Sequence, residues 1–142
     1  MPTAKELKDM AQSRLNEAKL LCDNGYYDGA NYLIGYVIEY SLKAVICKTL
    51  NIDSYLDFGD FSPAFKTHKL DNLLILSGLN KSFKDDLNNN TDLKINWSLL
   101  SDWNEQFRYN PIGTSDEINV RQRITALENT NNGVFEWIKK NW

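Results

Sequence analysis

Histidine and cysteine are scarce in this sequence of 142 residues, and each scarcity excludes a class of site. There is one histidine, so a zinc site or catalytic arrangement that needs two imidazoles is excluded. Two cysteines, Cys22 and Cys47, do not make a disulfide framework, and neither has a partner at metal-ligand spacing. We therefore expect two buried thiols, no metal and no cofactor.

Long apolar runs and an excess of positive charge are also missing. No run approaches the roughly 20 apolar residues of a transmembrane helix, and the opening sequence MPTAKELKDM lacks the apolar centre of a secretory signal. We therefore expect a cytoplasmic protein that does not bind a membrane. Because the formal net charge is −3, the molecule lacks the overall positive field that non-specific nucleic-acid binding requires. Contact with RNA would need a local cationic site.

Apolar residues at helical spacing are abundant. With 42% hydrophobic residues, the chain can bury one core, and we expect a single domain over residues 1–142. Residues 28–50 have almost no continuous polar face, so other helices should surround them. An amphipathic helix precedes them, with Thr3 and Glu6 as a capping box. Since only a short link separates Gly25 from the expected cap at Asp28, the two helices should form an antiparallel hairpin.

The second half of the chain predicts further helices and no sheet. Residues 51–66 read as a long loop whose acidic residues lack the spacing of a calcium loop. Beyond it, apolar periodicity predicts a helix capped by Thr67, a short helix capped by Ser82, and a helical stripe from Leu93 to Phe107. A last helix should open at a Thr114–Glu117 capping box, with a kink or fraying at 129–133. The fold class is therefore all-α, an up-and-down bundle of four to five helices.

Ionisable residues stand inside the helix that should be buried. Glu39 and Lys43 are four residues apart and therefore share one face, with Tyr36 and Tyr40 beside them. Charge in such a helix is costly unless it is paired.

Two further groups could join this pair. Histidine is the residue type that exchanges protons near neutral pH, and His68 stands at an expected helix start. Arg108 and Tyr109 close a helix just before Pro111. Together these residues form either a buried salt-bridge network or a small polar pocket, in which Arg108 and Lys43 receive a phosphate and a tyrosine stacks on a base.

The sequence resembles the HEPN domains in several short stretches: Gly25-Tyr-Tyr-Asp-Gly-Ala30, Gly35-Tyr-Val-Ile-Glu-Tyr-Ser-Leu-Lys-Ala44, His68-Lys-Leu70 and Arg108-Tyr109. The resemblance implies a bundle of four to five helices that commonly dimerises, so we expect a homodimer. Members of that family occur as partners of minimal nucleotidyltransferases, as nucleotide-binding modules, and as metal-independent ribonucleases in toxin–antitoxin, phage-defence and CRISPR systems.

The sequence departs from the ribonuclease members. Those members have an arginine, a polar residue after it, and a histidine four to six residues from the arginine. Here Arg108 is followed by Tyr109, and no histidine follows His68, so Arg121 and Arg123 lack such a partner too. Metal-free RNA cleavage needs a group that exchanges a proton near neutral pH, and a guanidinium does not.

The functional hypothesis is therefore a module that binds a nucleotide or RNA and has no catalytic residue. Its site would contain Glu39, Lys43, His68, Arg108 and Tyr109. Arg108 and Lys43 would pair with phosphate, Glu39 would orient one of them, and His68 or Tyr109 would contact a base or ribose. The alternatives are a metal-independent ribonuclease toxin and a purely structural subunit that pairs with itself or with a nucleotidyltransferase.

Overall fold

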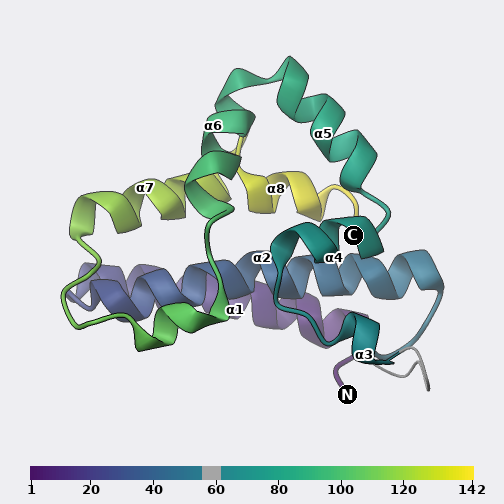
Figure 1. The fold of residues 1–142 in the computed structure, drawn as a ribbon, viewed down its shortest axis with the longest axis horizontal. Helices are drawn as coiled ribbons and strands as arrows, with labels where there is room; N and C mark the ends of the chain where they lie inside the picture. The colour runs from purple at the N-terminus through teal and green to yellow at the C-terminus, as the bar shows by residue number, and fades with distance from the viewer. Residues whose placement is uncertain (56–61) are drawn as a thin grey trace.

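The computed structural model describes residues 1–55 and 62–142. Its first two helices, α1 (Ala4–Asp23) and α2 (Tyr27–Leu50), form the expected antiparallel hairpin (Figure 1). The capping box is confirmed, because Thr3 Oγ1 accepts from the Glu6 N–H at 3.2 Å and Glu6 Oε2 accepts from the Thr3 N–H at 2.8 Å. The cap expected at Asp28 is wrong. Since α2 begins at Tyr27, Asp28 lies inside the helix, and its carboxylate accepts hydrogen bonds from a distant loop instead.

Three short helices follow: α3 (Ser62–Phe65), α4 (Leu70–Leu76) and α5 (Asn80–Asn89). The expected cap at Thr67 is wrong, since α4 begins at Leu70 and the Thr67 hydroxyl instead accepts from the Lys69 N–H at 3.1 Å. Ser82 also lies inside its helix rather than at the start, and its hydroxyl donates to a carbonyl of the preceding turn. Residues 56–61 of the expected loop lie outside the described residues.

The expected single helix from Leu93 to Phe107 is two helices, α6 (Thr91–Leu100) and the 3₁₀ helix η2 (Glu105–Tyr109). Between them the chain turns so that Trp103 packs directly on Gly35 of α2, where any Cβ would overlap the indole ring. The indole Nε1–H donates to the Tyr32 carbonyl at 3.0 Å. Burial of this ring outweighs continuation of the helix, and it fixes η2 against α2.

The last expected helix is also two, α7 (Glu117–Glu128) and α8 (Val134–Lys139). Asp116 caps α7 by accepting from the Asn119 N–H at 2.8 Å, so the capping box expected at Thr114 is wrong. At 129–133, where a kink or fraying was expected, the helix is fully interrupted. A Cβ at Gly133 would overlap backbone atoms of the preceding turn, which shows how tightly the chain folds back there.

The helix α2 lies at the centre of the fold. It contacts α1, α4, α7, α8 and η2, while α5 and α6 meet at a corner away from the hairpin (Figure 1). Cys22 and Cys47 are free and buried, as expected, and burial raises the pKa of both thiols. No β-strand occurs within residues 1–55 and 62–142. The β-type pairing in these residues is an isolated antiparallel bridge between Thr3 and Ser54. The all-α expectation is therefore confirmed.

The described helices include none with the length and apolarity that crossing a membrane requires.

Candidate functional site

A buried carboxylate organises the charged groups beside α2. Glu39 is 1% exposed, and its two oxygens have different partners: His68 Nδ1 lies 2.5 Å from Oε1, and Lys43 Nζ lies 3.4 Å from Oε2. A charge so deeply buried is tolerated when it is paired and hydrogen-bonded. Three of the five expected site residues therefore meet in one cluster.

His68 lies in the segment before α4, and its side chain is 45% exposed. Because Nδ1 faces Glu39, Nε2 is the ring nitrogen available to a ligand. In the neutral ring with the proton on Nδ1, Nε2 is an acceptor, whereas in the protonated ring it is a donor. The carboxylate thus fixes the direction in which the imidazole acts.

Lys43 is largely enclosed by the fold. Its side chain is 12% exposed, and Nζ lies 5.1 Å from the centre of the Tyr55 ring as well as near Glu39. This position lets the ammonium group compensate the Glu39 charge from inside the fold.

Arg108 and Tyr109 lie on η2, and both are exposed. The guanidinium carbon of Arg108 lies 4.9 Å from the centre of the Tyr109 ring, and interaction with the hydroxyls of Tyr109 and then Tyr32 raises the pKa of Arg108. In the described part of the chain, no hydrogen bond or ion pair joins Arg108 to Lys43 or His68.

Glu105 connects the two groups electrostatically. The pKa of Glu105 is lowered, first by a hydrogen bond with its own backbone and then by interactions with the side chains of His68, Gln106 and Arg108. Glu105 therefore lies within electrostatic range of both His68 and Arg108. Sequence reasoning missed Glu105 because nothing in its spacing relates it to His68.

Tyrosines at helical spacing also line this side of α2. The hydroxyls of Tyr32 and Tyr36 lie 2.9 Å apart, and the ring centres of Tyr36 and Tyr40 lie 5.5 Å apart. Burial raises the pKa of Tyr36 and Tyr40. Tyr32 was not among the expected site residues, although its spacing of four from Tyr36 was a visible signal.

The described residues contain no group of three His, Cys, Asp or Glu side chains placed to hold a metal ion.

Comparison of the sequence with models of known protein families identifies the family of this chain. The model of the HEPN domain matches residues 4–141, nearly the whole chain. A search of curated proteins and a search of solved structures each found no match. The chain therefore belongs to the HEPN domain family, and this membership indicates a role connected with nucleotides or RNA.

Proposed function

We propose that this protein is a HEPN module that binds the phosphate of a nucleotide or RNA without cleaving it. The observation that carries the proposal is the bond between buried Glu39 and half-exposed His68, because it leaves one ring nitrogen free to face outward. Arg108 of η2 lies on the same side of α2, since Glu105 interacts electrostatically with both His68 and Arg108. Such a fixed imidazole can donate to a phosphate oxygen when protonated.

The other residues have distinct roles in this proposal. Arg108 supplies the planar guanidinium that suits bidentate phosphate contact, and Tyr109 offers a ring to a base or ribose. Lys43, which the sequence indicated as a direct phosphate contact, instead neutralises Glu39, since its side chain is 12% exposed. The phosphate contacts therefore fall to His68 and Arg108.

Binding without cleavage follows from the number of proton carriers. Attack by the ribose 2′-hydroxyl needs one group to accept its proton and another to protonate the leaving oxygen. The sequence has one histidine, and the raised pKa of Tyr36 and Tyr40 makes neither phenol a base near neutral pH.

Calorimetric titration with inorganic phosphate and with ADP tests this site. We expect Arg108→Ala and His68→Gln each to weaken binding of both by about tenfold or more, as for loss of a charge-assisted hydrogen bond. Arg121→Ala is the matched control, because Arg121 is an exposed arginine that pairs with Asp23 and Glu117 on another part of the surface. Equal weakening in all three variants, or none in the first two, would refute the proposed site.

A metal-independent ribonuclease is the second candidate, and the Glu39–His68 bond also favours it. A carboxylate that orients an imidazole is the arrangement used for general base catalysis in many hydrolases. The test is incubation of single-stranded RNA with the protein in EDTA, together with growth of cells that express it. Cleavage and growth arrest that disappear in His68→Gln and Arg108→Ala would support this candidate, whereas an intact RNA would exclude it.

Self-association, with or without a nucleotidyltransferase partner, is a third candidate. Exposed apolar residues from two helices line one hollow: Ile95 is 53% exposed and Ile118 is 71% exposed, and Leu99 lines the same hollow. Burial of this surface in a homodimer would be favourable. Equilibrium sedimentation of the parent protein and an Ile118→Asp variant tests it, and a monomeric parent would contradict it.

A further inference from the structure

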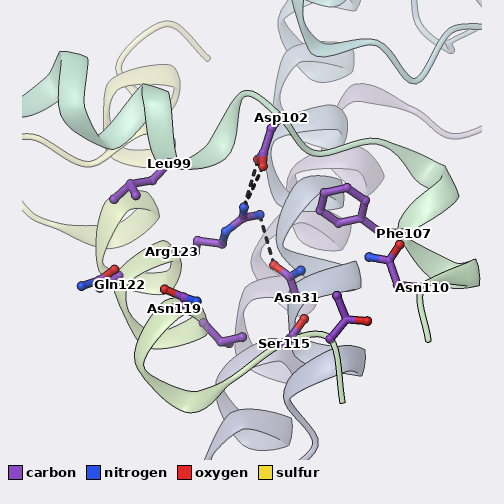
Figure 2. A pocket seen from close by; sticks show the side chains of 11 residues that line it. Asn31, Leu99, Asp102, Phe107, Asn110, Ser115, Asn119, Gln122 and Arg123 are labelled. Carbon is purple, nitrogen blue, oxygen red and sulfur yellow. Dashed lines mark hydrogen bonds and ion pairs between the residues drawn. The ribbon is translucent and has the colours of Figure 1, made fainter. Parts of the chain in front are cut away.

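A cavity of about 360 Å³ lies among α2, α6, η2 and α7, with both polar and apolar side chains in its wall, and none of the proposed phosphate-site residues lines it (Figure 2). Its wall contains four carboxamides, one aromatic ring and one guanidinium: Asn31, Asn110, Asn119, Gln122, Phe107 and Arg123. Volumes of this size accommodate small ligands, and convergent polar groups in a cavity are typical of a binding site.

The guanidinium of Arg123 is held in place at the centre of this cavity. Its Nη2 donates to both carboxylate oxygens of Asp102 at 3.0 Å, and its Nη1 donates to Asn31 Oδ1 at 3.2 Å (Figure 2). The Arg123 side chain is 17% exposed. Because Asp102 balances its charge, Arg123 presents a fixed planar surface rather than a free cation. The cavity therefore favours an uncharged, flat ligand over a phosphate.

Phe107 adds an aromatic surface. The guanidinium carbon of Arg123 lies 5.9 Å from the centre of the Phe107 ring. Unpaired nucleobases stack on aromatic rings and on arginine guanidinium planes, and their edges are then read by hydrogen bonds. The two flat groups in this cavity suit that form of recognition.

The carboxamides indicate which edge would be read. In the described part of the chain, the side chains of Asn110 and Gln122 make no hydrogen bond, and Asn119 uses its Nδ2 to donate to Asp116 at 2.9 Å. A carboxamide offers a donor and an acceptor side by side, which match N7 and the 6-amino group of adenine. Guanine is instead matched by arginine, and both terminal nitrogens of Arg123 already have partners.

The loop that forms part of the cavity wall is held by hydrogen bonds to α2. Both oxygens of Asp28 accept from backbone N–H groups of the loop that precedes α7, those of Gly113 at 2.7 Å and Ser115 at 2.8 Å. This attachment ties the loop that follows Asn110 to α2. A preformed site loses less conformational freedom when it binds.

We propose that this cavity binds an unpaired adenine base. The inference rests on the proposed function in that the ligand is a nucleotide or RNA, and it adds a base-specific contact at a second place. Free nucleosides carry no phosphate, so they test the cavity without involving His68 or Arg108.

Titration with adenosine, guanosine and uridine, followed by calorimetry or by amide chemical shifts, tests the inference. Adenosine should bind more tightly than the other two, and Asn110→Ala and Gln122→Ala should each weaken it by about tenfold. Asn88→Ala is the matched control, because Asn88 is an exposed carboxamide on α5 with no side-chain hydrogen bond in the described part of the chain. It should leave adenosine binding unchanged.

The outcomes separate this inference from the proposed function. If adenosine does not bind, or binds no better than guanosine, or is unaffected by both Asn110→Ala and Gln122→Ala, the adenine site is wrong. Phosphate binding that is still lost in Arg108→Ala would then leave the proposed function standing. Conversely, adenosine binding that depends on Asn110, with no phosphate binding at all, would refute the phosphate site alone.

Discussion

Glu39→Gln is the substitution that most directly tests how the charged cluster is stabilised. The change keeps the shape of the side chain but removes a negative charge from a position that is 1% exposed. Lys43, at 3.4 Å, loses its anionic partner, while the new amide oxygen can still accept from His68 Nδ1. The main loss is therefore the pairing of an enclosed ammonium group.

Removal of one member of a buried ion pair typically costs about 3–5 kcal/mol. Here the cost should be lower, because the Tyr55 ring at 5.1 Å still faces the Lys43 ammonium group, and such a contact is worth about 0.5–1 kcal/mol. We therefore expect a loss of about 2–4 kcal/mol in the free energy of unfolding. Urea denaturation measures it directly if the slope with denaturant is unchanged.

A double-mutant cycle with Lys43→Met separates pairing from general disruption. The Glu39→Gln, Lys43→Met variant should be more stable than the sum of the single effects predicts, by about 1–2 kcal/mol, because it leaves no unpaired charge. Glu128→Gln is the control, since Glu128 pairs with Lys19 near the surface and should cost less than about 1 kcal/mol. A loss below about 1 kcal/mol for Glu39→Gln, or an additive cycle, would show that the Glu39–Lys43 pair does not stabilise the fold in this way.

Two other substitutions test the contacts that position the sites. Gly35→Ala should destabilise the fold by about 2–4 kcal/mol, because the new methyl group overlaps Trp103. Gly29→Ala is the control on the same helix, because a Cβ there would lie 3.4 Å from its nearest neighbour, and it should change stability by less than about 1 kcal/mol. Equal melting temperatures for the two variants would contradict this packing. Asp28→Asn should cost about 1 kcal/mol at pH 7. Because two loop N–H groups lower the pKa of Asp28 in the folded protein, its stabilisation is present above pH 3.8 and is lost as pH falls through the folded pKa. The difference between parent and variant in urea should therefore shrink in acid, and a constant difference would exclude this cause.

The first two helices could be predicted from sequence because their signals are local. The Thr3–Glu6 capping box and the apolar faces of α1 and α2 require only neighbouring residues, and the structure confirms them. The apolar residues from Leu93 to Phe107 also keep a helical period, yet the helix stops after Leu100. A period describes how residues face a core, but it does not show that Trp103 gains more by packing on Gly35.

Helix starts were predicted less well, for a related reason. Several Ser, Thr and Asp residues stand near each start, and each can accept from a backbone N–H. Before α7 the sequence indicated a capping box that opens at Thr114, whereas in the structure Asp116 caps the helix. Thr114 instead belongs to the turn at Pro111, where its hydroxyl donates to the proline carbonyl at 2.5 Å.

The candidate site was partly visible in the sequence. Spacing placed Glu39 and Lys43 together, whereas the approach of His68 depends on how α4 packs on α2. The cavity beside Arg123 had no sequence signal, because its side chains come from four separate elements, α2, α6, η2 and α7, and form no motif. Contacts of this kind are fixed by tertiary packing alone.

The packing of the Trp103 indole positions residues of both proposed ligand sites. Asp102, which binds the guanidinium of Arg123 in the cavity, immediately precedes Trp103, and Arg108 follows Trp103 by five positions. The position of this ring on α2 therefore sets the distance between Arg108 and the cavity that contains Arg123. An RNA strand that contacted both Arg108 and the cavity would need a length that fits this distance. Trp103 would then determine which lengths of RNA bind, although it contacts neither the phosphate nor the base.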